Sequence, residues 1–283
     1  MKKLLLTFLA AGTLAWCAHA DELVPPITAT PTQTWDPGQL VWADLLTDDV
    51  DAAKAFYSKV FAWDFVGDNQ YAQASHGGVP VAGIAFHAPH DPNVSEVAWL
   101  ISISVDDVDA AVNAASGAGG TVLEAPRSVP ERGRFAIIED NQDAVLVLLK
   151  SAQGDPPDRR SVDNEWIWAE LWTPDTAVAA DFYAAAVGYE AKTITENDGG
   201  RYTLLTHGGA PKTGIVPLPW ENVEPNWLPY LRVADVGDTI ERVENAGGQV
   251  LLPPRKENDD GRVAIVSDPT GGVFAIQARR AAQ

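Results

Sequence analysis

The stretch Val41–Thr47, with the sequence VWADLLT, returns at Ile167–Thr173 as IWAELWT. A Phe-Tyr pair follows each copy at the same offset, as Phe56-Tyr57 and as Phe182-Tyr183. Self-similarity at a fixed spacing is typical of repeated structural units. The 283-residue chain is therefore expected to contain two domains of one kind.

Further matches occur in the same order along both halves, at offsets of 126 to 131 residues. They pair Tyr71 with Tyr202, His76-Gly77-Gly78 with His207-Gly208-Gly209, Gly83 with Gly214, Ala118-Gly119-Gly120 with Ala246-Gly247-Gly248, and Gly133-Arg134 with Gly261-Arg262. This order predicts a first domain at 37–150 and a second at 164–279. A polar, proline-containing linker at 151–163 joins them.

A second repeat lies inside the first domain, where the hexapeptide DDVDAA occurs at 48–53 and again at 106–111. Each copy follows an apolar, β-branched run that is typical of a strand, at 40–46 or 97–105. Apolar residues at helical spacing come after each copy, so each predicts the start of a helix. Three strand-like runs follow each helix, at 63–66, 71–75 and 81–86 and then at 121–123, 134–139 and 144–149.

Local signals also predict where the helices begin and end. Thr47 and Thr173 are expected as N-caps, and Pro174 suits a first helical position. The glycine pairs at 119–120 and 247–248 are expected at helix ends.

The resulting order, βαβββ four times with two modules per domain, resembles the vicinal oxygen chelate superfamily. Asp-Val opens three of the four helices, and the stretch Asp268-Pro269-Thr270-Gly271 precedes the last strand. Glyoxalase I, bleomycin-resistance proteins and extradiol dioxygenases belong to this superfamily. The resemblance implies tandem α+β domains, each an open, cup-shaped mixed sheet with helices outside and the ligand in the cup.

The enzymes of that family usually bind a divalent cation through His, Gln or Glu on inward-facing strand positions. We located the family's metal-ligand positions in this sequence by counting back from the aspartates that open the helices. The residues at these positions have no atom suited to bind a cation. These residues are Trp42, Trp168, Leu100, Leu228, Val147 and Ala275. We therefore predict that the protein holds no metal and no cofactor.

The histidines do not supply a metal site in their place. His76 and His207 each precede a Gly-Gly pair, where a turn residue is expected. His87 and His90 with Asp91 form a cluster that has no counterpart in the second domain. Such a cluster indicates at most an adventitious surface site.

Strand alternation selects the residues of the predicted binding face. Side chains two residues apart point to the same side of a strand, so Trp42 shares a face with Asp44, and Trp168 shares one with Glu170 and Trp172. The family's ligand position coincides with the first tryptophan of each set, so the resemblance implies that these faces line the cups. We predict that these five residues bind the ligand.

Two interpretations of Asp44 and Glu170 remain open. In the functional one, these candidate catalytic carboxylates accept a hydrogen bond from, or act as a general base toward, a flat molecule stacked on the indoles. In the structural one, Arg134 or Arg262 neutralises each carboxylate, or backbone groups satisfy it.

Three hypotheses for the function follow. The first is metal-independent binding of a small organic molecule, aromatic or cationic, with no established reaction. The second is a lyase, an isomerase or a dioxygenase-like enzyme of the superfamily that uses a carboxylate or an unrecognised metal site. The third is a domain pair used for protein interaction. The chain is expected to act as a monomer with two domains or as a homodimer.

The first twenty residues predict a secretory signal. Lys2 and Lys3 precede an apolar run at 4–16 that is too short to span a bilayer, and Ala18-His19-Ala20 is a suitable cleavage site. An exported protein, periplasmic or extracellular, with a flexible N-terminal segment at 21–36 is therefore expected. The alternative is a lipid anchor through Cys17, although Trp16 is a poor residue for a lipobox.

The acidic composition limits the partners. The formal charge is −19, and removing the predicted signal leaves 18 basic against 39 acidic side chains. Phosphate backbones are repelled by such an excess, which argues against nucleic acid as a partner. We interpret the acidity as a solvated surface.

Overall fold

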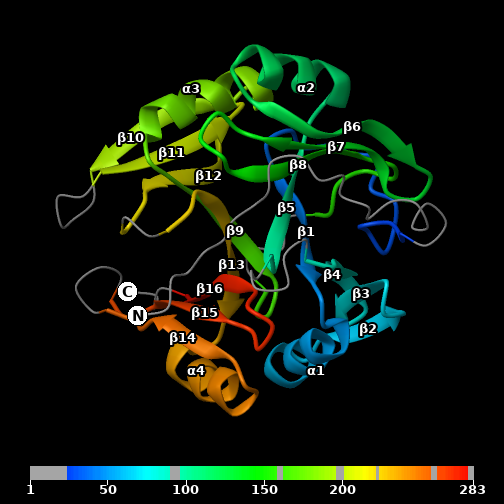
Figure 1. Ribbon diagram of the computed structural model, residues 1–283, viewed down its shortest axis with the longest axis vertical. Helices are drawn as coiled ribbons and strands as arrows, with labels where there is room; N and C mark the ends of the chain where they lie inside the picture. The colour runs from blue at the N-terminus through cyan, green and yellow to red at the C-terminus, as the bar shows by residue number, and fades with distance from the viewer. Residues whose placement is uncertain are drawn as a thin grey trace.

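The computed structural model describes residues 24–89, 96–157, 162–195, 201–220, 223–255 and 260–279. It contains two eight-stranded mixed sheets, one for each half of the chain, with two helices each (Figure 1). The predicted signal at 1–20 and the residues His90 and Asp91 lie outside the described residues. The expected α+β architecture of tandem domains is confirmed.

The first sheet has the strand order β2-β3-β4-β1-β5-β8-β7-β6. Its elements are β1 (Leu40–Thr47), α1 (Val50–Phe61), β2 (Asp64–Gly67), β3 (Tyr71–His76), β4 (Val79–Phe86), β5 (Ala98–Ser104), α2 (Val108–Gly117), β6 (Thr121–Val129), β7 (Gly133–Glu139) and β8 (Val145–Ser151).

The second sheet repeats this order as β10-β11-β12-β9-β13-β16-β15-β14. Its elements are β9 (Trp166–Thr173), α3 (Thr176–Val187), β10 (Glu190–Thr195), β11 (Arg201–His207), β12 (Ala210–Pro217), β13 (Asn226–Val233), α4 (Val236–Asn245), β14 (Gln249–Leu252), β15 (Val263–Ser267) and β16 (Val273–Ala278).

The two modules of each domain meet at the centre of its sheet. β1 pairs antiparallel with β5 and parallel with β4, and β9 pairs in the same way with β13 and β12. In this register Asp44 lies between Gly83 and Leu100, and Glu170 lies between Gly214 and Leu228. The two carboxylates therefore occupy matching central positions.

The helices begin at aspartates, so the expectation of Thr47 and Thr173 as N-caps is wrong. Both threonines are the last residues of strands. The caps are Asp49, Asp107, Asp175 and Asp235, whose side chains accept from backbone N–H groups of the first turn. A carboxylate at this position also interacts favourably with the helix dipole.

The two domains share their hydrophobic cores. One cluster of buried side chains joins β5, α2, β7 and β8 to β9 and α3, and a second joins β1, α1 and β4 to β13, α4 and β16. Figure 1 shows α2 beside α3 at one end of the molecule and α1 beside α4 at the other. Each helix layer thus packs against the other domain, which favours cooperative unfolding of the whole chain.

The Phe-Tyr repeat supplies a polar link inside the second of these shared cores. The Trp99 indole donates to the Tyr57 hydroxyl at 3.1 Å, and Tyr57 donates to Asp268 of the second domain at 2.8 Å. Burial raises the pKa of Asp268 and raises that of Tyr57 well above its ordinary value. Tyr57 therefore remains a neutral hydroxyl donor at ordinary pH.

A second link crosses the other shared core, and here the tyrosine belongs to the second domain and the aspartate to the first. Trp227 donates to the Tyr183 hydroxyl at 3.0 Å, and Tyr183 donates to Asp140 of the first domain at 2.9 Å. Burial also raises the pKa of Asp140. The repeated Phe-Tyr pair, which marks the two domains in the sequence, thus helps to hold them together.

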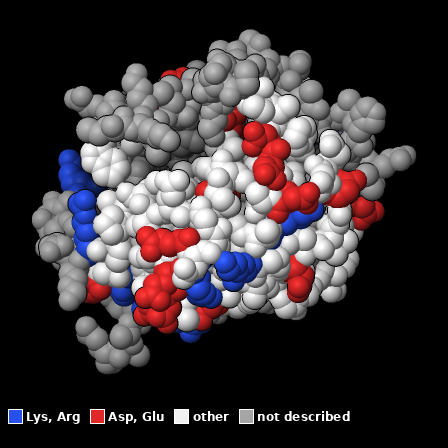
Figure 2. Space-filling model, turned by 60° about the horizontal axis from the view of Figure 1, so that its bottom comes forward, with Lys and Arg blue, Asp and Glu red and all other residues white. Residues whose placement is uncertain are grey.

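The face of the molecule drawn in Figure 2 carries mixed charge where it is described. On the face in Figure 2, acidic side chains lie interspersed with lysines, arginines and uncharged residues. This distribution is typical of a solvated surface. No helix in the described part of the chain is long and apolar enough to cross a membrane.

Candidate functional site

Alternation along β1 places Trp42 and Asp44 on the side of the sheet that faces away from α1. Trp42 and Leu46 belong to a buried cluster of the first domain alone, whereas Ala43 and Leu45 pack into the core shared with the second domain. Trp42 and Asp44 are 2% and 4% exposed. The predicted face of the first domain is therefore closed to solvent.

The Asp44 carboxylate has hydrogen-bond and ion-pair partners within its own domain. Its Oδ1 accepts from the Trp42 indole and from the Tyr71 hydroxyl, both at 2.9 Å, and Arg132 Nη1 lies 3.8 Å from Oδ2. The Arg132 guanidinium lies over the Trp42 ring, 4.9 Å from its centroid, and also donates to Tyr71. Burial raises the pKa of Tyr71, so its hydroxyl stays protonated and able to donate.

The cation beside Asp44 is Arg132, and the expectation of Arg134 as its partner is wrong. Arg134 forms an ion pair at 2.6 Å with Asp109 on the exposed side of α2. Gly133 separates the two arginines and has a φ of 113°, a backbone conformation that favours glycine. We attribute the opposite directions of the two side chains to this residue, because regular strand geometry would place them on the same side.

The N-terminal segment closes the first face. Val24 and Ile27 are buried in the same cluster as Trp42, and the Gln73 side chain donates to the Pro26 carbonyl at 2.8 Å. A cavity of about 20 Å³ lies beside Asp44, roughly the room that one water molecule needs. Residues 24–36, the described part of the segment predicted at 21–36, thus run along the first domain.

The matching face of the second domain is more open. Trp168, Glu170 and Trp172 are all half-buried, and they alternate with the buried Ala169 and Leu171. The position that matches Arg132 is Asp260, which is exposed. The second domain therefore differs from the first in having no arginine at this position.

Two tyrosines organise the polar groups of this second face. The Trp168 indole donates to the Tyr202 hydroxyl at 3.0 Å, and the Tyr230 hydroxyl donates to Glu170 at 2.5 Å. Tyr230 stands where the first domain has Ser102, since both pair with the first tryptophan of their domain. Arg262, the predicted partner of Glu170, is half-buried just before β15.

Tyr71 and Tyr202, like Arg132 and Tyr230, are polar residues of these faces that the sequence analysis did not predict. The place of Tyr71 and Tyr202 in the repeat was visible, and so was that of Gly83 and Gly214. A Cβ atom on Gly83 would lie 2.3 Å from the Tyr71 hydroxyl, and one on Gly214 would lie 1.8 Å from that of Tyr202. Each glycine leaves space for the tyrosine hydroxyl. The repeated Tyr and Gly positions were therefore the sequence signal from which the place of these tyrosines could have been predicted.

The residues at the family's metal positions do not fit a divalent cation. The side chains there are indole or aliphatic, and a cation needs oxygen, imidazole or thiolate ligands. Within the described ranges, no group of three or more His, Cys, Asp or Glu side chains could hold a metal ion. His76 instead lies 3.4 Å from Glu165, and His87 lies 2.9 Å from Glu96.

Paired βαβββ modules with their helices outside define a two-domain protein of the vicinal oxygen chelate type. The family model of the Glyoxalase/Bleomycin resistance protein/Dioxygenase superfamily matches residues 39–148 and 167–276. The chain therefore belongs to this superfamily.

Full-length relatives carry different functional names. The Mycobacterium tuberculosis protein named "Putative glyoxylase CFP32" is 32% identical over 241 residues, which cover 83% of this chain and 92% of the relative. The Streptomyces peucetius protein named "Anthracycline biosynthesis protein DnrV" is 29% identical over 257 residues, which cover 85% of this chain and 93% of the relative.

Solved structures agree with the fold. The Mn(II)-bound glyoxalase of Novosphingobium aromaticivorans has a TM-score of 0.60 at 17% identity and covers 86% of this chain and 82% of its own. A homoprotocatechuate 2,3-dioxygenase variant from B. fuscum has a TM-score of 0.62 at 12% identity, with coverages of 90% and 74%. At these identities the likeness shows the fold alone.

Proposed function

We propose that the protein is exported and binds a small organic molecule, without a metal, on the second-domain face formed by Trp168, Glu170 and Trp172. The observation that carries this proposal is the difference between the two matching faces. Asp44 is 4% exposed and is satisfied within its domain, whereas Glu170 is half-buried among indoles that are also partly accessible.

The chemistry of this face favours a flat molecule with a hydrogen-bond donor. Trp168 and Trp172 offer large apolar contacts at a small cost in side-chain entropy. Tyr230 donates to Glu170, and a carboxylate can accept several hydrogen bonds at once. A phenol or a cation can donate to this carboxylate, whereas a carboxylate or phosphate on the ligand would be repelled.

The relatives' names support small-molecule chemistry without deciding the compound. A role in anthracycline biosynthesis, as the name of the Streptomyces relative states, is consistent with a planar aromatic ligand. An enzyme, a lyase or isomerase that uses Glu170 as the base, is the second candidate. The observation behind this candidate is that the Tyr230 hydroxyl lies beside Glu170 and places a proton donor next to the candidate base.

Replacing Glu170 with Gln is expected to weaken the binding of a planar phenol by about 1.5–3 kcal/mol, the range for a hydrogen bond to a charged group. The measurement is calorimetric titration with 2,6-dihydroxyanthraquinone, whose hydroxyls are too far from the carbonyls to donate within the molecule. Anthraquinone, which lacks the two donors, is expected to bind wild type and variant equally. Equal affinity of the phenol for wild type and Glu170→Gln would remove Glu170 from the site.

The purified protein is expected to contain no tightly bound divalent metal, because residues without a ligand atom occupy the six positions where the family's ligands would stand. Elemental analysis after dialysis is the measurement. Near-stoichiometric zinc, nickel, iron or manganese would show that the ligand positions have been assigned to the wrong residues.

Export is expected to release a chain that begins at Asp21, given the basic start, the short apolar run and the Ala18-His19-Ala20 site. N-terminal sequencing and intact mass of protein taken from the native cell envelope test this cleavage. A lipid-modified Cys17 at the new terminus would support the anchored alternative instead.

A further inference from the structure

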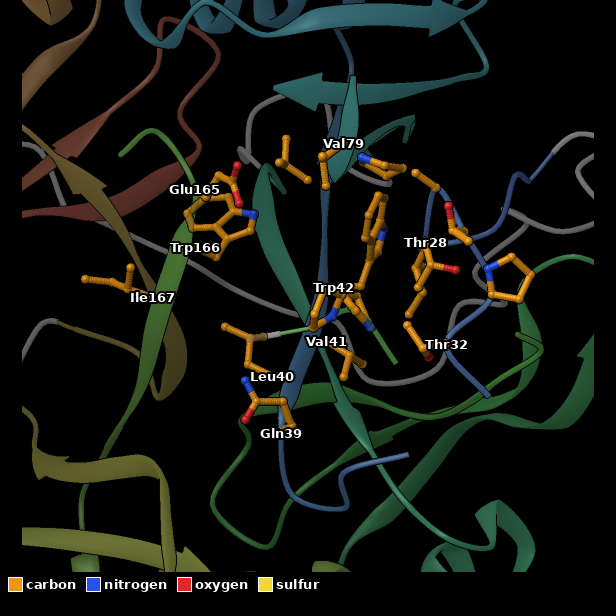
Figure 3. A pocket seen from close by; sticks show the side chains of 18 of the residues that line it. Thr28, Thr32, Gln39, Leu40, Val41, Trp42, Val79, Glu165, Trp166 and Ile167 are labelled. Carbon is orange, nitrogen blue, oxygen red and sulfur yellow. The ribbon is translucent and has the colours of Figure 1, made fainter. Parts of the chain in front are cut away.

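A cavity of about 320 Å³ lies between the two domains, apart from Glu170 and Trp172. β1 and β4 of the first domain and β9 of the second form its walls, and residues 27–32 and 156–157 close it. In Figure 3, Glu165, just before β9, and Trp166, the first residue of β9, lie on one side. Thr28 and Thr32 line the other side, with Val41 and Trp42 between them. Its size is at the low end of the roughly 300–1,000 Å³ of small-molecule sites.

Most of the wall is apolar and aromatic. Trp42, Trp166 and Trp168 all line the cavity, together with aliphatic residues such as Leu40 and Val81. A molecule bound here would therefore be mostly apolar. Trp168 also belongs to the second-domain face, so the cavity and this face are neighbours.

Two polar atoms of this wall are buried and have no hydrogen-bond partner among the described residues. They are the Thr28 hydroxyl oxygen and the Trp166 indole nitrogen. Thr28 as a whole is 6% exposed. An unpaired buried polar atom costs free energy, so native proteins rarely keep one without a ligand, a water molecule or another use for it.

The charged groups of the wall already have partners. Lys212 forms an ion pair with Asp36 at 2.5 Å, and Glu165 lies 3.4 Å from the His76 ring. A charged ligand would have to compete with these partners. A neutral ligand leaves them undisturbed.

The closing segment is fastened to the rest of the protein. The backbone N–H of Thr32 donates to the Gln153 carbonyl at 3.0 Å, and its hydroxyl donates to the Asp155 carbonyl at 2.9 Å. Asp155 in turn accepts from the Asp36 backbone at 2.8 Å. The segment that carries Thr28 is therefore held over the cavity by hydrogen bonds to residues 153–155.

We propose that this inter-domain cavity is a second binding site, for a neutral and mostly apolar organic molecule that carries a carbonyl or hydroxyl oxygen. The oxygen accepts from the Trp166 N–H, which can only donate, or from the Thr28 hydroxyl on the opposite side of the cavity. The indoles and aliphatic side chains enclose the remainder. This site does not depend on ligand binding at Glu170.

The test uses Prodan, a neutral fluorescent naphthalene ketone whose emission shifts to the blue in apolar surroundings. Wild type is expected to bind it saturably. Thr28→Val keeps the shape of the side chain and removes the hydroxyl, and is expected to weaken binding by about three- to tenfold. The melting temperature of this variant is expected to equal or exceed that of wild type, because an unpaired buried hydroxyl is lost.

Thr34→Val is the matched control, since Thr34 lies on the same segment but is exposed and does not line the cavity, and it is expected to leave Prodan affinity unchanged. Val79→Trp adds bulk to the cavity wall and is expected to abolish binding. The proposal is overturned if wild type does not bind Prodan, or if neither Thr28→Val nor Val79→Trp weakens binding. It is also overturned if Glu170→Gln weakens Prodan binding as much as Thr28→Val does, because the probe would then lie on the second-domain face.

Discussion

Replacing Arg132 with Met is expected to lower the free energy of unfolding by about 3–5 kcal/mol, the usual loss when one partner of a buried ion pair is removed. Arg132 and Asp44 are 5% and 4% exposed. The variant leaves Asp44 with two neutral donors, Trp42 and Tyr71, and no cation. Urea denaturation followed by circular dichroism measures the loss.

Arg134→Met is the control for this prediction, because Arg134 is a neighbouring arginine whose ion pair with Asp109 is exposed. Its effect should be much smaller, since solvent screens exposed pairs. The double variant Asp44→Asn with Arg132→Met should recover part of the loss, because no uncompensated charge remains. An equal loss in Arg132→Met and Arg134→Met would show that Asp44 is solvated in the folded protein.

Replacing Asp268 with Ala is expected to cost about 3–4 kcal/mol, because several buried donors would lose their acceptor at once. Asp268 accepts from the backbone N–H groups of Thr270, Gly271 and Gly272 at 2.8 to 3.0 Å. It also accepts from the Tyr57 hydroxyl of the first domain at 2.8 Å. The variant thus loosens both the β15–β16 turn and a contact between the domains.

Asp235→Ala is the control, since it removes an exposed aspartate that caps α4 and should cost about 0.5–2 kcal/mol. Thermal unfolding monitored by calorimetry compares the two. If the shared cores couple the domains, Asp268→Ala should still unfold in one transition at a lower temperature. Two separate transitions in wild type would contradict the coupling.

The fold could be predicted because its signals are local and occur twice. The copies of VWADLLT and of DDVDAA fix strand-to-helix junctions, and alternation along β1 and β9 assigns the faces without any knowledge of packing. The helix caps were misassigned to Thr47 and Thr173 because the strands run up to these threonines. The aspartate two residues later is the first residue free to cap the helix.

The solvent exposure of the two faces could not be predicted, because it depends on contacts between distant parts of the chain. Arg132 reaches Asp44 from the turn before β7, past a glycine with positive φ, and strand alternation alone does not place it there. Val24 and Ile27 cover the first face although nothing in their local sequence indicates it. Two equivalent sequence stretches therefore lie in different environments, one closed and one partly open.

A crystal structure of the protein with 2,6-dihydroxyanthraquinone tests the central claim most directly, that the second-domain face binds the ligand and the first is closed by the chain itself. The expected result is density for the ligand against Trp168 and Trp172, with a phenol oxygen at hydrogen-bonding distance from Glu170 and with Val24 and Ile27 still covering Trp42. Density beside Asp44, with the N-terminal segment displaced and the second face empty, would contradict it.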